Sequence, residues 1–244
     1  MAGNGGSRRR PTPRRPAPGA KKAPGAKKTV AAKKRPTASS AVPAPDEAPR
    51  TFTLGLVPGT TPGKWISAWR ERMPRVELAL LPLAVADQHD ALRERRVDAA
   101  LVRLPLDDDD LHIVRLYDEV PVAIVPADSH LTATDELELA DLAGEIIIVP
   151  GDDVLSATVP GAVSPAFAPP AAIQDAVETV AAGIGVVLAP MSLARLHARK
   201  DVAARPVRDA PVSTVALAWP REATTADVDA FVGIVRGRTA NSSR

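Results

Sequence analysis

Cysteine is absent from the 244 residues, and aromatic side chains make up only 3% of them. Without cysteine the chain has no disulfides, no thiolate metal ligands and no cysteine nucleophile. No run of about 18 apolar residues occurs, so no transmembrane helix is predicted. The basic residues near the N-terminus are not followed by an apolar stretch of about 7–15 residues, as a secretory signal requires. We therefore expect no contact with a membrane, and a cytoplasmic location.

The total charge of +2 conceals two regions of opposite charge. Residues 1–50 hold 13 Lys and Arg against 2 Asp and Glu, a net charge of +11, whereas residues 51–244 hold 18 against 27, a net charge of −9. Large apolar side chains are almost missing from the first region. Such a segment cannot bury enough apolar surface to offset its ordering entropy, about 1–2 kcal/mol per residue. We expect a disordered basic arm over residues 1–50 and a folded domain over residues 51–244.

Clustered cations recur along the arm, between prolines, alanines and glycines. Cations on a flexible chain neutralise phosphates and release counterions, which predicts non-specific contact with DNA or RNA. No aromatic residue lies among them, which argues against base stacking. The alternative is a solvated tail that only aids solubility. In composition, the lysine-rich part resembles the tails of linker histones and nucleoid proteins. The residues predicted to contact nucleic acid are Arg8, Arg9, Arg10, Arg14, Arg15, Lys21, Lys22, Lys27, Lys28, Lys33, Lys34 and Arg35.

From residue 51 onward, short apolar runs alternate with segments of helical period, which indicates an α/β fold with helices on the faces of a parallel sheet. Strands are predicted at residues 53–57, 76–81, 97–102, 111–117, 120–125, 146–149, 184–189 and 212–219. Helices are predicted at residues 87–96, 135–142 and 191–198, in the segment that ends near Gly183, and at the C-terminus. A further helix is predicted to begin at Pro62, with Thr61 as its N-cap. We expect two lobes, the first at about residues 51–125 and 213–240 and the second at about residues 126–212.

Several segments, in this order and with compatible spacing, resemble the effector-binding domain of LysR-type transcriptional regulators. They are Thr53-Leu-Gly-Leu-Val, Leu92-Arg-Glu-Arg-Arg-Val-Asp-Ala-Ala-Leu-Val-Arg103, Val122-Ala-Ile-Val-Pro with His130-Leu131, and Val180-Ala-Ala-Gly-Ile-Gly-Val-Val-Leu-Ala-Pro190. The resemblance covers residues 52–238. It implies a fold like the type-2 periplasmic binding proteins, with two Rossmann-like lobes around a cleft for a small molecule, often a carboxylate. It also implies a sensing role in transcription regulation, and pairing with a second copy or with another LysR-type protein.

Candidate ligand contacts follow from this frame. Thr60 and Thr61 precede a helix whose N-terminus would point at the cleft, and free amides and hydroxyls there favour an anion. Arg103 follows a parallel strand, where ligands of open α/β sheets bind. It can clamp a carboxylate, or it can form a salt bridge between the lobes. Gly151 and Asp152 follow another strand and are predicted to line the cleft, with helix capping by Asp152-Asp153 as the alternative.

The chain departs from the family pattern at three places. Residues 1–50 have no helical apolar period, so the winged helix-turn-helix of full-length regulators is not expected in them. The usual Ser/Thr-rich loop reads Leu83-Ala84-Val85-Ala86, and Ala172 stands where a serine is common. A small polar ligand would lose hydrogen bonds there. Residues 151–170 are rich in Pro, Gly and Ala where the family often has a helix.

Other chemistries find little support. The four histidines show no metal-ligand spacing, and the acids at residues 107–110 are better explained as a solvated loop than as a cation site. The Gly183-Ile-Gly185 turn lacks the third glycine of a nucleotide loop, so we expect no metal and no cofactor. Ser156 and Ser164 lack the context of a hydrolase nucleophile. We predict a binding protein and no enzyme. An enzyme of the same two-lobed architecture and a solute-binding receptor are the alternatives.

Overall fold

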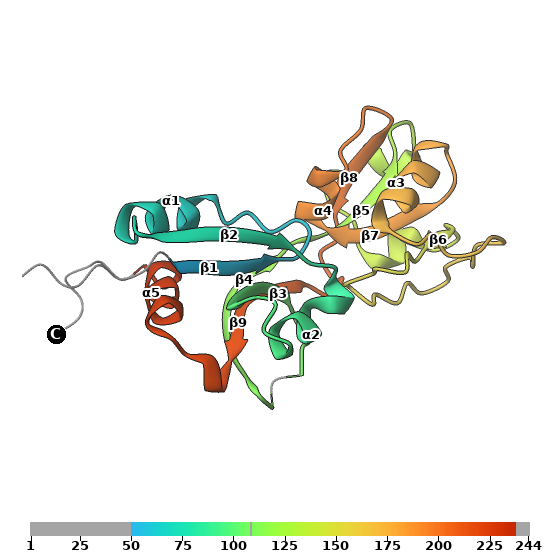
Figure 1. Ribbon diagram of the computed structural model, residues 1–244. Helices are drawn as coiled ribbons and strands as arrows, with labels where there is room; N and C mark the ends of the chain where they lie inside the picture. Colours follow the sequence, from blue (N-terminus) through green and yellow to red (C-terminus); the bar gives the residue numbers. More distant parts are fainter. Residues whose placement is uncertain (1–49, 108, 238–244) are drawn as a thin grey trace, which may run out of the picture. The chain divides into compact units, whose positions relative to one another are not determined.

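The computed structural model describes residues 50–107 and 109–237, and the chain forms two β-sheets, each with its own helices (Figure 1). Residues 1–49 of the predicted arm, which include every residue proposed to contact nucleic acid, lie outside the described residues. Among the helices that are described, none is long and apolar enough to cross a membrane.

The first sheet has the strand order β2-β1-β3-β9-β4. Its strands are β1 (Arg50–Leu56), β2 (Val76–Pro82), β3 (Ala99–Arg103), β4 (Leu111–Glu119) and β9 (Ser213–Pro220). The first three are parallel, and β9 runs antiparallel to β3 and β4. The C-terminal strand thus lies inside the sheet built by the N-terminal part of the chain, so this lobe forms only when both ends of the fold come together.

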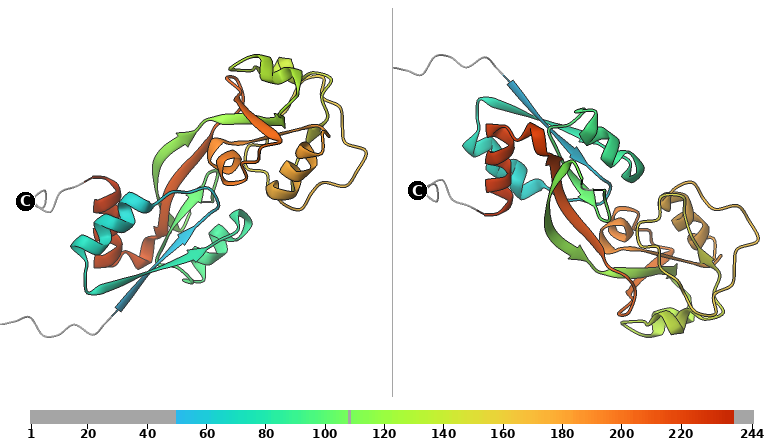
Figure 2. Two further views of the ribbon diagram at one scale, coloured as in Figure 1. Left: turned by 90° about the horizontal axis from the view of Figure 1, so that it is seen from above. Right: turned by 90° about the horizontal axis from the view of Figure 1, so that it is seen from below.

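Helices cover both faces of the first sheet. They are α1 (Gly63–Arg72), α2 (Gln88–Arg93) and α5 (Ala226–Val235), with the 3-10 turns η1 (Val85–Asp87) and η4 (Arg221–Ala223). Figure 2 shows α1 and α5 side by side on one face, where Phe52 stacks on Trp69 with ring centroids 4.7 Å apart and meets Phe231 at 5.4 Å. Helix α2 covers the other face through Leu92. The few aromatic residues of the chain are therefore concentrated in this core, where each buries a large apolar area.

The second sheet has the strand order β6-β7-β5-β8. Its strands are β5 (Pro121–Pro126), β6 (Ile147–Ile148), β7 (Val186–Pro190) and β8 (Val202–Pro206). Helices α3 (Ile173–Ala181) and α4 (Met191–Leu196) pack on one face, and the 3-10 turns η2 (His130–Ala133) and η3 (Leu139–Leu142) lie in the cluster on the other. Its core contains only aliphatic side chains.

The boundary between the lobes differs from the prediction. We expected residues 120–125 in the first lobe, but β5 pairs with β7 and β8 of the second sheet, so the chain crosses between Glu119 and Pro121. An apolar run such as β5 is buried in either lobe, and its composition does not say which neighbours it pairs with.

Two local predictions are also wrong, and one strand was not predicted. Pro62 takes the N-cap position of α1, and Thr61, the predicted N-cap, precedes it without a capping bond. Residues 135–142 are helical only at their end, as η3. Strand β8 was missed because its Val-Ala-Ala-Arg-Pro sequence is only half-buried and shows no apolar alternation. Residues 151–170, all described, contain no helix or strand, in line with their Pro- and Gly-rich composition.

Candidate functional site

The turn after β1 places Thr60 and Thr61 at the start of α1, as predicted from the sequence. Thr60 donates its hydroxyl hydrogen to the carbonyl of Val57 at 2.7 Å, so this hydroxyl is already used as a donor inside the turn. Gly59 has a φ of +83°, and a Cβ at this position would stand 2.5 Å from Oγ of Ser192 and 3.1 Å from Cδ2 of Leu193. The turn therefore needs glycine, both for its backbone conformation and for its close approach to α4 of the second lobe.

Arg103 is the last residue of β3 and is 2% exposed. Its Nη1 donates to Oε2 of Glu119 at 2.6 Å and to Oγ of Ser213 at 2.7 Å. Its Nη2 donates to the carbonyl of Pro58 at 3.1 Å and to Oγ of Ser192 at 3.2 Å. The guanidinium thus contacts both lobes, and we call Arg103, Glu119, Ser192 and Ser213 the hinge cluster.

The position of the hinge cluster explains its partners. Glu119 ends β4 just before the chain enters the second lobe, and Ser213 begins β9 just after it returns; the two residues face each other in the β4–β9 ladder. The sequence left open whether Arg103 clamps a ligand carboxylate or bridges the lobes by a salt bridge. The carboxylate that it binds in the structure is that of Glu119, in its own sheet, and it reaches the second lobe through the hydroxyl of Ser192. A buried charge of this kind requires its partner, because an unpaired charge is costly to bury.

Gln88 and Tyr117 complete the surroundings of this cluster. The side chain of Gln88 donates to the carbonyl of Arg103 and accepts from its backbone N–H, both at 2.9 Å. Burial and the charge of Glu119 raise the pKa of the Tyr117 hydroxyl, and Arg103 acts in the opposite direction. Sequence analysis missed Gln88, Glu119, Ser192 and Ser213. No local pattern indicated Glu119, which directly follows Asp118 in the sequence.

Asp152 follows β6 and lies near the N-terminus of α3. Its Oδ1 is buried and has no hydrogen-bond partner. Burial raises the pKa of this carboxyl, while the backbone N–H groups of Ile173 and of Asp152 itself favour its charged form. The neighbouring Asp153 differs, because its two oxygens accept from the backbone N–H groups of Leu155 and Ser156. Asp153 closes a local turn and caps no helix, whereas the N–H of Ile173 at the start of α3 favours the charged form of Asp152, whose Oδ1 has no hydrogen-bond partner.

This carboxyl lies in a narrow crevice that has no space for a water molecule. Its wall is apolar apart from the two acids, and we call it the Asp152 pocket; it is lined by Pro150, Asp152, Asp153, Val154, Ile173, Leu188, Ala189, Pro190 and Leu193. Gly151 is outside this lining, and its N–H donates to the carbonyl of Pro170 at 2.9 Å. Gly151 thus holds the loop that precedes α3, and Asp152 faces the pocket.

The start of α4 brings these features together. Ser192 binds Arg103, and the adjacent Leu193 both lines the Asp152 pocket and packs against the turn at Gly59. Of the predicted ligand contacts, Arg103 and Asp152 are therefore connected through two consecutive residues. Thr61 is exposed and is outside the lining of the Asp152 pocket.

Two other features of the sequence resolve as surface structure. Asp110, from the predicted acidic loop, lies 3.4 Å from Arg93 and 3.9 Å from His89. Within residues 50–107 and 109–237, no three His, Asp or Glu side chains gather as metal ligands would.

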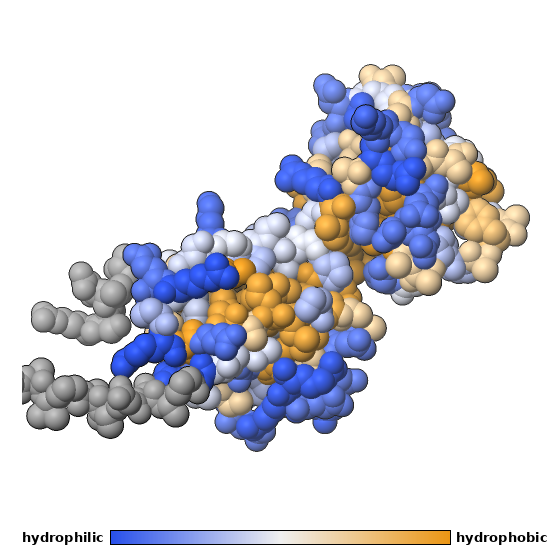
Figure 3. All heavy atoms as spheres, turned by 45° about the horizontal axis from the view of Figure 1, so that its top comes forward, coloured by the Kyte–Doolittle hydropathy of each residue, from blue (hydrophilic) through white to orange (hydrophobic). Residues whose placement is uncertain are grey.

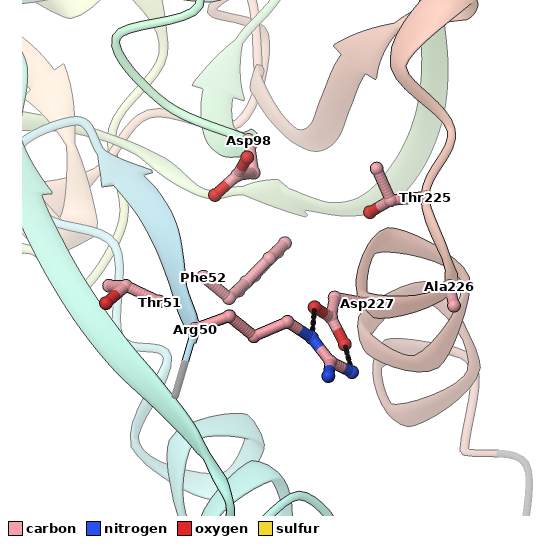
Figure 4. A pocket seen from close by; sticks show the side chains of 7 residues that line it. All are labelled: Arg50, Thr51, Phe52, Asp98, Thr225, Ala226 and Asp227. Carbon is pink, nitrogen blue, oxygen red and sulfur yellow. Dashed lines mark hydrogen bonds and ion pairs between the residues drawn. The ribbon is translucent and has the colours of Figure 1, made fainter. Parts of the chain in front are cut away.

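A larger hollow of about 370 Å³ lies at the beginning of β1, where Arg50 and Asp227 form a two-bonded ion pair (Figure 4). Arg50, assigned by its charge to the arm, is the first residue of this strand.

Comparison with known proteins decides the family. The model of the LysR substrate binding domain matches residues 46–240. The chain belongs to this family. The Hca operon transcriptional activator HcaR of Escherichia coli is 27% identical over 206 residues, which cover 79% of this chain and 69% of HcaR. The regulator CatR of Pseudomonas putida is 35% identical over 136 residues, or 52% of this chain and 46% of CatR. The chain thus spans about half to two thirds of these relatives.

Solved structures of LysR effector-binding domains share the fold. The BenM effector-binding domain with its effector benzoate has a TM-score of 0.62 and 21% identity, covering 78% of this chain and 95% of that one. The regulatory domain of reduced OxyR from Pseudomonas aeruginosa has a TM-score of 0.60 and 22% identity, covering 78% and 96%. The predicted family and two-lobed α/β fold are therefore confirmed, and the match falls on the folded part of the chain.

Proposed function

We propose that this LysR-type domain binds a small organic acid between its lobes and acts in transcription regulation as a binding protein, not as an enzyme. The observation that carries the proposal is the junction at Ser192 and Leu193, where the turn after β1, the hinge cluster and the Asp152 pocket meet. A ligand at this junction contacts both lobes, so binding changes the balance between their arrangements. The BenM domain, of the same fold, was solved with benzoate.

Thermal melting of the full chain with benzoate and other small organic acids tests the proposal. A ligand that binds only the folded protein, at about 100 times its Kd, adds about 2.7 kcal/mol, which corresponds to a rise in Tm of about 5–10 °C. Leu193→Trp places a larger side chain at this junction and should abolish the shift. Leu196→Trp, on the same helix at a side chain that is 57% exposed, is the matched control and should retain it. Equal shifts in both variants would place binding elsewhere.

The arm is proposed to contact DNA or RNA without sequence specificity. Its clustered cations and net charge of +11 support this, against −9 for the rest of the chain. We expect full-length chain to bind duplex DNA at low salt, with log K falling as log salt rises. Changing the twelve arm cations from Arg8 to Arg35 to Gln should remove binding, whereas Arg70→Gln with Arg75→Gln in the domain should not. Binding that survives loss of the arm cations would contradict this part.

The same proposal includes pairing of the domain with a second copy or with another LysR-type chain. It also includes a cytoplasmic location. Figure 3 shows apolar side chains gathered on one face of the first lobe, and Leu80 of the edge strand β2 is 43% exposed. Large exposed apolar patches commonly mark protein contacts. Sedimentation of the full chain tests pairing: Leu80→Glu should shift a dimer toward monomer, and Val212→Glu, at an exposed residue beside β9, is the control.

A further inference from the structure

The four acceptors of the Arg103 guanidinium are divided unequally between the lobes. Glu119, Ser213 and the carbonyl of Pro58 belong to the first lobe, whereas the hydroxyl of Ser192 belongs to helix α4 of the second lobe. If the lobes move apart, three of these four hydrogen bonds can persist within the first lobe. The bond from Nη2 of Arg103 to Oγ of Ser192 is the one that such a movement breaks.

The backbone of Arg103 is also fixed in the first lobe. The side-chain amide of Gln88 bonds both the N–H and the C=O of Arg103 at 2.9 Å, and strand β3 stays paired with β9 as far as Arg103 and Val215. Gln88 and Arg103 are both buried. Buried hydrogen bonds are costly to leave unmade, so Arg103 stays with the first sheet and does not follow Ser192.

The space between the donor and the acceptor is open because residue 59 is glycine. A Cβ on Gly59 would stand 3.0 Å from Nη2 of Arg103 and 2.5 Å from Oγ of Ser192, so it would press against both atoms. The hydrogen bond between these atoms is 3.2 Å long, at the upper end of the ordinary range. A side chain at position 59 would therefore push the donor and the acceptor apart.

Helix α4 begins where the chain crosses from the first lobe to the second. The N–H of Met191, its first residue, donates to the carbonyl of Val120, which lies between β4 and β5. Ser192 follows directly, so its position depends on the path of the chain at this crossing. A change in the angle between the lobes shifts Ser192 relative to Arg103, and a small displacement is enough to lose a bond that is already 3.2 Å long.

We propose that the hydrogen bond from Arg103 to Ser192 is a latch: it holds the two lobes in the arrangement described here, the closed one, and sets its ratio to an open one. As a regulatory device the latch rests on the proposed function, because the acid is proposed to bind where these residues meet. Hinged lobes commonly populate a minor arrangement at about 0.1–10%. Loss of one hydrogen bond to a charged group is large enough to change such a ratio about tenfold.

The absence of cysteine allows the lobes to be labelled at two introduced positions. Asp229→Cys on α5 and Ala182→Cys directly after α3 place exposed labels in different lobes. Pulsed electron paramagnetic resonance of the spin-labelled full chain, diluted with unlabelled chain, gives the distribution of distances between them. We expect Ser192→Ala to raise the ratio of open to closed arrangement about tenfold, which corresponds to about 1.4 kcal/mol.

Ser213→Ala is the matched control, because it removes a hydroxyl acceptor from the same guanidinium within the first lobe. It should lower the urea midpoint and leave the distance distribution unchanged, whereas Gly59→Ala should shift the distribution in the same direction as Ser192→Ala. Melting curves of all variants report folding.

If Ser192→Ala leaves the distribution as in the unaltered chain, or if Ser213→Ala shifts it equally, the inference is wrong. The measurement contains no ligand, so this result would leave the proposed function standing. Failure of every organic acid to bind would remove the proposed function and leave the latch in place.

Discussion

The hinge cluster and the Asp152 pocket hold charged side chains that differ in burial and in pairing, since Arg103 is buried and Asp152 is half-buried. In the hinge cluster, Arg103 is 2% exposed, and its two terminal nitrogens make four hydrogen bonds. In the pocket, Oδ1 of Asp152 is buried and makes none. Glu119 gives Arg103 a counter-charge although Nε of Arg103 is buried without a partner, whereas a buried oxygen without a partner, such as Oδ1 of Asp152, is costly to the unliganded protein. The pairing of Arg103 favours a structural role for this residue at the junction of the lobes.

Removal of the hinge carboxylate is expected to have the largest effect. Glu119→Ala leaves the guanidinium of Arg103 buried without a counter-charge, which should lower the free energy of unfolding by about 3–5 kcal/mol. Urea denaturation measures the change. Glu222→Ala, which breaks the exposed pair with Arg95, should cost less than about 1 kcal/mol. If both variants lose a similar free energy of unfolding, the buried charge of Arg103 depends no more on its partner than an exposed ion pair does.

Gly59 tests how closely the lobes approach at the hinge. Gly59→Ala adds a Cβ at 2.5 Å from Oγ of Ser192, whereas Gly144→Ala, with a φ of +85° that nearly equals the +83° of Gly59, meets nothing within 4 Å. The backbone conformation alone costs about 1–2 kcal/mol in each. We expect Gly59→Ala to cost more than Gly144→Ala in urea denaturation. Equal costs would show that the contact between the turn and α4 is loose.

The contact between Arg103 and the second lobe is expected to contribute less. Ser192→Ala removes one acceptor from the guanidinium and should cost about 0.5–1.5 kcal/mol in denaturation. Ser67→Ala, whose hydroxyl is exposed and donates to Gly63 in α1, is a control with an expected cost near zero. A cost for Ser192→Ala no larger than that of the control would mean that Arg103 does not join the lobes.

The Asp152 carboxyl should give a small effect of opposite sign. Burial raises its pKa in the folded state above the value in the unfolded state. The folded protein therefore binds this proton more readily, and stability falls as pH rises from about 4 through the folded pKa. Asp152→Asn removes the charge, so at pH 7 it should be more stable than the unaltered chain, with the difference shrinking toward pH 4. Melting curves across this range measure it, and a destabilised Asp152→Asn at pH 7 would show that the carboxylate is well paired.

Much of the fold could be predicted from the sequence, whereas for the site only its approximate position could be predicted. Apolar runs such as that of β7 and the periodicity of α1 are local signals, and segments in a family order carried the two-lobed architecture. The partners of Arg103 were not accessible in this way, because Glu119 and Ser213 lie 16 and 110 residues from it and carry no local pattern. The lobe that contains β5 was misassigned for the same reason, since strand pairing is a property of the whole chain.

The central claim is that the ligand site lies where the turn after β1, the hinge cluster and the start of α4 meet. Hydrogen exchange of the full chain, with and without a small organic acid that binds it, tests this claim most directly. The expected result is joint protection of backbone amides at residues 58–62, 151–155 and 191–195, because one ligand there contacts both lobes. Protection confined to the hollow around Arg50 and Asp227, or to the second lobe alone, would contradict a site between the lobes.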